Sequence, residues 1–252
     1  MILDTNNGEL DVHVDGDGPT VVLLPSLGRG ASDFDDLASR LVAAGYRAVR
    51  PEPRGIAAST PTELQPTMAD LAADVAHVIR ATSAGTATVV GHAFGNRVAR
   101  QTATACPELV DAVVLLACGG MVPGDPEAMT ALGAVFDMDL TPEQHLDAVR
   151  TAFFAPGNDA SVWEDGWYAD VATVQSRATL GTPVEEWWHA GSARVLVVQP
   201  DGDRVSPVAN ADAIVAALGS RATRVTVLGA GHALLPEQPD AVAAAVLDWL
   251  AT

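Results

Sequence analysis

The chain of 252 residues carries a formal net charge of −18, and arginine supplies all of its fixed positive charge because it contains no lysine. Such an acidic surface repels phosphate backbones, so the composition argues against nucleic-acid binding. No apolar run approaches the roughly 20 residues of a membrane helix, and two cysteines are too few for a disulfide scaffold. The first residues lack the basic and apolar stretches of a signal peptide. We therefore expect a folded, cytoplasmic protein without membrane contact.

The first half of the chain alternates strand-like and helix-like segments. Residues 9–14 alternate polar and apolar side chains, as a half-exposed edge strand does. Residues 21–24 are apolar throughout, as in a strand that is covered on both faces. A glycine-rich loop, residues 25–30, then leads to a predicted helix with its start at Ser32 and Asp35. Further predicted elements are strands at residues 46–50, 86–90 and 113–116 and a helix over residues 67–80.

Residues 121–190 have a different character, because strand-like runs disappear there. Two helix starts, Thr141-Pro142-Glu143-Gln144 and Thr182-Pro183-Val184-Glu185, each place Thr at the cap and Pro at the first helical position. This stretch also holds eight of the chain's twelve aromatic residues. We predict a helical cap over a core formed by residues 1–120 and 191–252. Most of the rings are expected to pack the cap, and the candidates for substrate binding are Trp163, Trp167 and Trp187.

The alternating pattern resumes after residue 190 with predicted strands at residues 194–198 and 224–228. A helix ends near Leu218, and a closing helix ends near Trp249. Strands that alternate with helices of this length predict right-handed crossovers and a mostly parallel sheet. Each of these last two strands is followed by a turn that carries one chemically active side chain, Asp203 in the first and His232 in the second.

The chain is organised around residues 89–100, in which a strand feeds Gly91-His92-Ala93-Phe94-Gly95 and then a helix. This strand–turn–helix layout is the context in which Gly-x-Ser-x-Gly forms a nucleophile elbow. The central position is Ala93, which offers no nucleophile. The elbow, Asp203 and His232 all follow parallel strands, so we expect them to meet at the carboxyl edge of the sheet, where open α/β sheets bind ligands.

The whole chain resembles the α/β-hydrolase superfamily, in particular its small single-chain members with a helical cap. Besides the elbow, the resemblance is carried by four stretches: the loop Leu23-Leu24-Pro25-Ser26-Leu27-Gly28, Pro53-Arg54-Gly55 with Ser59, Asp203 ahead of Pro207, and Gly231-His232 with Glu237 and Pro239. The resemblance implies that Asp203 is the acid and His232 the base of a catalytic triad. It also implies an oxyanion hole formed by the backbone N–H groups of Leu27 and Phe94.

Two positions depart from the family pattern. The nucleophile position holds Ala93, and Pro25-Ser26 replaces the usual His-Gly pair of the oxyanion loop. Ser26 is a candidate to donate a hydrogen bond to substrate, although a serine in such a loop also commonly stabilises its own turn. Three explanations of Ala93 stay open: a replacement of a serine, a natural alanine with retained or altered chemistry, and a non-catalytic binding protein.

These patterns favour an enzyme that acts at a carbonyl of a small apolar or aromatic substrate and hydrolyses an ester, a lactone or a similar bond. One alternative is a lyase, isomerase or cyclase that uses the His232–Asp203 dyad for proton transfer. The other alternative is a ligand-binding protein without turnover. We expect no cofactor, since His, Cys and Asp lack metal-ligand spacing and Gly28-Arg29-Gly30 lacks the Lys-Ser/Thr of a phosphate loop. The oligomeric state is left open.

Overall fold

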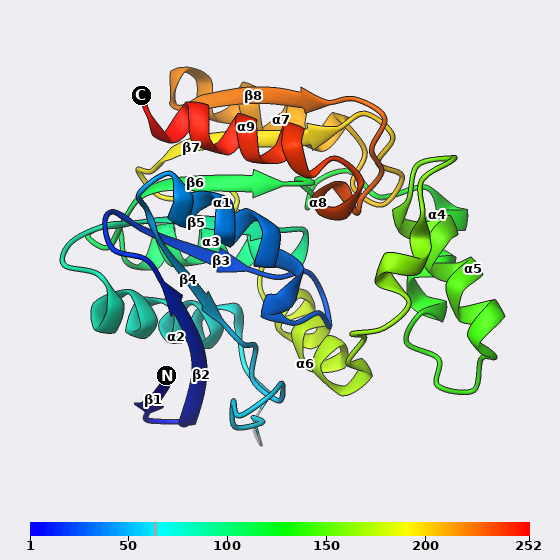
Figure 1. Ribbon diagram of the computed structural model, residues 1–252, viewed down its shortest axis with the longest axis horizontal. Helices are drawn as coiled ribbons and strands as arrows, with labels where there is room; N and C mark the ends of the chain where they lie inside the picture. The colour runs from blue at the N-terminus through cyan, green and yellow to red at the C-terminus, as the bar shows by residue number, and fades with distance from the viewer. Residues whose placement is uncertain (63–64) are drawn as a thin grey trace.

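The computed structural model describes residues 1–62 and 65–252, and its centre is one sheet of eight strands (Figure 1). The strands are β1 (Ile2–Thr5), β2 (Gly8–Asp15), β3 (Thr20–Leu24), β4 (Arg47–Pro51), β5 (Ala87–His92), β6 (Val110–Leu116), β7 (Arg194–Pro200) and β8 (Ala222–Val227). Their order across the sheet is β1-β2-β4-β3-β5-β6-β7-β8. The pairs β1–β2 and β2–β4 are antiparallel, and the other neighbours are parallel. This arrangement confirms the predicted α/β fold.

The first strand of the structure was not expected from the sequence. Because β1 pairs with β2, the segment predicted as an edge strand lies between β1 and β4, and the edge is β1 itself. The turn between the two strands has Gly8 at φ 97°, in the left-handed region that suits glycine. The Asn7-Gly8 pair is a hairpin signal, so this correction was within reach of the sequence.

The helices lie on both faces of the sheet and at its carboxyl edge. They are α1 (Asp35–Ala43), α2 (Met68–Thr82), α3 (Phe94–Ala105), α4 (Pro126–Ala134), α5 (Pro142–Phe153), α6 (Ala169–Leu180), α7 (Ala209–Leu218), α8 (Leu234–Glu237) and α9 (Pro239–Leu250). Short 3-10 turns are η1 (Ala31–Phe34), η2 (Ala160–Trp163), η3 (Val184–Glu186) and η4 (Gly219–Arg221). In the described part of the chain, no helix combines the length and the apolar character needed to cross a bilayer.

Two apolar clusters hold the layers together, and the period of two along each strand separates them. Val22 and Leu24 of β3 join the cluster that contains α2, α3 and α7. Val21 and Leu23 of the same strand point to the other face, where they join the cluster that contains α1 and α9. The central strands are therefore buried on both faces, which is why their sequences read as continuous apolar runs.

The predicted helix starts are observed with two corrections. Thr67 and Thr141 each form a capping box at the start of α2 and α5. By contrast, α1 is preceded by the 3-10 turn η1 and has no side-chain cap. The sequence Thr182-Pro183-Val184-Glu185 starts only the short 3-10 turn η3, not an α-helix. Trp187 and Trp188 follow at once and are both buried, and adjacent positions do not share one face of a helix.

Residues 117–193 join β6 to β7 and contain α4, α5 and α6, with no strand among them. We call this segment the helical insertion. In Figure 1 the arrows of β3, β6 and β8 point toward α4 and α5, while α6 lies below the end of β3. A third apolar cluster links the insertion to the turn that carries His232, through Phe153, Trp163 and Ala233. The insertion thus stands at the carboxyl edge of the sheet.

Candidate active site

The turn between β5 and α3 holds Ala93 in a strained backbone conformation, with φ 50° and ψ −104°. The Ala93 N–H donates to the carbonyl oxygen of Leu116 on the neighbouring strand at 3.0 Å. Two glycines permit the turn. A Cβ at Gly91 would lie 2.3 Å from the Asn96 nitrogen, and one at Gly95 would lie 2.2 Å from the Leu24 carbonyl oxygen. The elbow geometry is therefore built into the backbone although the central side chain is a methyl group.

His232 and Asp203 meet at the ends of β8 and β7. The His232 Nδ1 lies 2.9 Å from Asp203 Oδ2 and 3.1 Å from Oδ1. Asp203 Oδ1 also accepts from the backbone N–H groups of Val205 at 2.9 Å and Ser206 at 2.7 Å. Both side chains are buried. Because a carboxylate only accepts hydrogen bonds, it places the imidazole proton on Nδ1 and leaves Nε2 free to act as a base.

The turn that carries His232 is fixed by Glu237. Its carboxylate accepts from the N–H groups of Gly231 and Ala155, each at 2.7 Å, and from the Asn158 side chain at 2.6 Å. Burial raises the pKa of Glu237 above its ordinary value. The hydrogen bonds lower this pKa, but their effect is smaller than that of burial. Glu237 thus joins the His232 turn to the end of α5 in the helical insertion.

His92 supports the same turn from beneath. Its Nε2 donates to the carbonyl oxygen of His232 at 2.8 Å, while its Nδ1 is buried without a hydrogen-bond partner in the described residues. Burial, together with the nearby His232, lowers the pKa of His92 from 6.5 to about 3. The imidazole is therefore neutral near pH 7, and it acts on the position of His232 through the backbone.

Two backbone N–H groups of residues close to Ala93 lack hydrogen-bond acceptors in the described part of the chain. Neither the Leu27 nor the Phe94 N–H has an acceptor among the described residues, and both residues line the cavity next to Ala93. The loop that contains Leu27 is tied to α6 through the Gly28 N–H, which donates to the Gln175 side chain at 2.8 Å. A free pair of N–H groups beside the start of a helix can stabilise a negatively charged oxygen.

Most of the predicted site residues lie in or directly behind the wall of one cavity, which has a volume of about 550 Å³. Ser26, Leu27, Ala93, Phe94 and His232 all line it, and Asp203 lies directly behind His232. The rest of the lining comes from the helical insertion, including its 119–124 loop, from α3 and from the turn after Asp203. Its apolar members are Met121, Val122, Pro123, Met129, Leu132, Phe136, Phe153, Leu180 and Val205.

Three predicted substrate-binding residues are not brought to this cavity. Trp163 and Trp167 enclose Arg29, whose guanidinium carbon lies 4.5 Å from each ring centroid. Trp187 is buried against Arg100, with the guanidinium carbon 4.6 Å from its ring. None of the three is among the residues that line the cavity. The rings pack against Arg29 and Arg100, and their contact with substrate stays a prediction.

The cavity wall includes polar residues that the sequence analysis did not single out. They are Arg97, Ser176, Thr179 and Ser206. Arg97 lies one helical turn after the elbow, so its spacing from Ala93 was a usable signal. Ser206 lies three residues after the predicted acid, Asp203, in the same turn. Ser176 and Thr179 belong to α6, whose position relative to the elbow depends on the tertiary fold.

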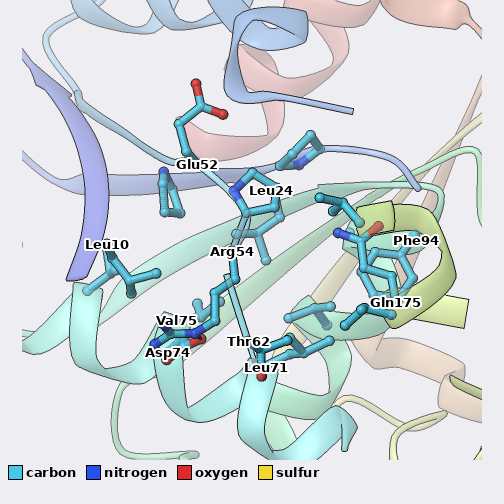
Figure 2. Close-up of a pocket in the computed structure, with 18 residues that line it drawn as sticks. Leu10, Leu24, Glu52, Arg54, Thr62, Leu71, Asp74, Val75, Phe94 and Gln175 are labelled. Carbon is cyan, nitrogen blue, oxygen red and sulfur yellow. Dashed lines mark hydrogen bonds and ion pairs between the residues drawn. The ribbon is translucent and has the colours of Figure 1, made fainter. Parts of the chain in front are cut away.

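A second, smaller cavity of about 80 Å³ lies on the other side of Phe94, which lines both. Figure 2 shows Phe94 and Gln175 at one end of it and Leu10 at the other. Arg54 and Asp74 form a bidentate ion pair within its wall, at 2.6 and 2.7 Å. Apart from Phe94, which lines both cavities, none of the residues that we assign to catalysis lines this smaller one. In the described residues, no group of three or more His, Cys, Asp or Glu side chains is placed to hold a metal ion.

The sheet and the helices on its two faces define an α/β-hydrolase fold, and comparisons with known proteins agree. Residues 21–245 match the model of the alpha/beta hydrolase family. The chain belongs to this family.

Individual relatives support the same fold. Rv0554 from Mycobacterium tuberculosis is 26% identical, with a TM-score of 0.79 over 96% of this chain and 93% of its own. A thermophilic esterase from Thermogutta terrifontis is 20% identical, with a TM-score of 0.81 over 100% and 97% of the two chains.

Two curated relatives are longer than the part that matches. Polyketide synthase ThaQ of Burkholderia thailandensis is 29% identical over 93% of this chain, which is 12% of ThaQ. RutD of Variovorax paradoxus is 34% identical over 42% of this chain and 40% of its own. The chain therefore spans only a small part of ThaQ, and its match to RutD covers less than half of either protein.

Proposed function

We propose that this protein is an enzyme that hydrolyses an ester, a lactone or a similar bond at a carbonyl of a small apolar or aromatic substrate. The observation that carries the proposal is the convergence of the His232–Asp203 pair, the free N–H groups of Leu27 and Phe94, and Ala93 on one cavity. The mostly apolar wall suits a substrate whose body is hydrocarbon and whose carbonyl is its main polar group.

The chain as it stands has no side-chain nucleophile at residue 93, so water takes that role. His232 Nε2 accepts a proton from a water molecule in the space beside the Ala93 methyl group, and the resulting hydroxide adds to the carbonyl carbon. The Leu27 and Phe94 N–H groups stabilise the oxyanion. The tetrahedral intermediate then collapses, and the imidazolium returns the proton to the leaving oxygen. With serine at residue 93, the same groups would instead form and hydrolyse an acyl-enzyme.

The expected rates follow from the effect of removing the nucleophile in serine proteases. Loss of the nucleophile costs about 10⁶ in kcat, while oxyanion stabilisation and binding retain roughly 10³–10⁴ over water. An activated ester is therefore within reach of the chain with Ala93, and an amide is not. This difference sets the choice of substrate for the test.

Ala93 itself favours one second candidate, a proton-transfer enzyme. An imidazole base opposite an oxyanion hole suits removal of a proton next to a carbonyl, as in an isomerase, lyase or cyclase. Such chemistry needs no nucleophile at residue 93. It uses His232, Asp203 and the two N–H groups in the same positions.

The test compares hydrolysis of short and medium aryl esters by the unmodified chain, Ala93→Ser, and Ala93→Ser combined with His232→Ala. We expect Ala93→Ser to raise the rate at least about 100-fold and the second change to abolish the gain. Ala58→Ser, which adds a hydroxyl at an exposed position, is the matched control. If Ala93→Ser gives no gain, acyl transfer is excluded, and proton transfer or ligand binding without turnover takes its place.

A further inference from the structure

The charge of the active-site cavity is opposite to that of the protein. The chain has 32 acidic residues and a net charge of −18, yet no Asp or Glu is among the described residues that line the cavity. Among the described residues of the lining, Arg97 is the one with a fixed charge. The long-range field of such a protein disfavours anions, so a local positive charge is needed if the cavity is to hold one.

Arg97 has no anionic partner of its own in the described residues. It makes no hydrogen bond or ion pair there, and its guanidinium carbon lies 5.7 Å from the Trp187 ring centroid. Two other arginines with well-covered side chains are paired with carboxylates, Arg29 with Asp33 and Arg54 with Asp74. The fully buried Arg100 instead bonds to oxygen atoms of Asn96 and Gly119. A guanidinium that is removed from water without a carboxylate is costly, and an anion in the cavity would offset that cost.

The surroundings of Arg97 increase the positive potential. Arg97 lies in the first turn of α3, where the helix already presents its positive end and no acidic side chain. Arg100, one turn nearer the middle of α3, is fully buried and bonds only to oxygen atoms of Asn96 and Gly119. Burial lowers the pKa of Arg97 from its ordinary value, as expected for a cation with no carboxylate beside it.

We propose that the natural substrate carries a carboxylate and that Arg97 binds it, which makes Arg97 a specificity-determining residue. This inference rests on the proposed function for the identity of the reacting bond. Arg97 and Ala93 line the same cavity and lie four residues apart in the sequence. The carboxylate therefore lies near the carbonyl that reacts, as in a half-ester of a short dicarboxylic acid. The planar guanidinium matches a carboxylate through two parallel hydrogen bonds.

The test is calorimetric binding of N-phenylsuccinamate and of its neutral primary amide, N-phenylsuccinamide, to the unmodified chain. Both compounds contain only amide bonds, which are too unreactive to be hydrolysed during the measurement. We expect the acid to bind about 10- to 100-fold more tightly than the neutral amide. Arg97→Gln should remove this preference, and Arg97→Lys should keep part of it, since lysine retains the charge without the fork.

Arg177→Gln is the matched control, because Arg177 is exposed on α6 and does not line the cavity. It removes the same charge and should leave the preference intact. The inference is overturned if the unmodified chain binds the acid and the neutral amide equally, a comparison that needs no variant to fold. It is also overturned if folded Arg97→Gln keeps the preference.

The hydrolase function and the carboxylate site at Arg97 can be refuted independently of each other. If Ala93→Ser hydrolyses neutral aryl esters but the acid shows no preference, the carboxylate site is wrong while the hydrolase function stands. If the acid is preferred through Arg97 but Ala93→Ser gives no hydrolysis, the carboxylate site stands and the reaction is a different one.

Discussion

Acidification should destabilise this protein through His92. Burial lowers the pKa of His92 from 6.5 to about 3, so the unfolded chain binds a proton between these values and the folded chain does not. A group whose pKa is lowered by folding contributes stability above its unfolded pKa, and this contribution is lost as the pH falls toward the folded pKa. The protein therefore loses stability below about pH 6.5.

The size of the loss follows from the two pKa values. Linkage gives about 2.6 kcal/mol lost from the unfolding free energy between about pH 7.5 and 4.5 for this one group. The structural reason is that a proton on Nδ1 would have no acceptor in the described residues, while Nε2 already donates to the His232 carbonyl oxygen. The side chain is 0% exposed, so solvent does not weaken the penalty.

The assay is urea unfolding at both pH values for the unmodified chain and for His92→Gln. Carboxylates contribute to the pH dependence of both proteins, so the quantity to compare is the difference between them. His92→Gln should lose less stability than the unmodified chain by about 2.6 kcal/mol over this range. His189→Gln, which removes an exposed histidine, is the control. If His92→Gln and the unmodified chain show the same pH dependence, His92 is not the buried neutral base that the structure indicates.

Two predictions concern the elbow and the loop beside it. Gly95→Ala should cost at least about 3 kcal/mol in urea unfolding, because its Cβ would lie 2.2 Å from the Leu24 carbonyl oxygen. Gly133→Ala, in open space on α4, should instead stabilise by about 0.5–1 kcal/mol, and equal effects would refute the steric argument. Arg29→Met should cost about 3–5 kcal/mol by leaving a buried carboxylate unpaired. Arg40→Met, in an exposed pair, should cost about 1 kcal/mol or less, and a similar loss for both would contradict the role of burial.

Most of the fold could be predicted because its signals are local. The central strands are apolar on both faces, and the capping sequences at Thr67 and Thr141 precede amphipathic runs long enough to form helices. The same capping sequence at Thr182 failed because two adjacent tryptophans follow it. Both are buried, and a continuing helix would have turned one of them away from the core.

The site could be predicted only where the backbone fixes it. Ala93, Asp203 and His232 follow strand ends, and parallel strands end at the same edge of the sheet, so their meeting follows from chain order alone. The placement of Trp163 and Trp167 does not follow from chain order. Whether a ring lines the cavity or packs around Arg29 depends on how the helical insertion folds over the sheet, and no spacing in the sequence encodes that choice.

The strain at Ala93 bears on why an alanine stands in an intact site. Holding a residue other than glycine at φ 50° and ψ −104° costs about 1–3 kcal/mol. In the proposed mechanism the elbow does two things: it presents the side chain of residue 93, and it holds the Phe94 N–H for the oxyanion. A methyl group at residue 93 cannot act as a nucleophile. The position of the Phe94 N–H is unaffected, because this N–H belongs to the backbone. In both proposed reactions, hydrolysis by water and proton abstraction beside a carbonyl, the strain would still serve the stabilisation of an oxyanion.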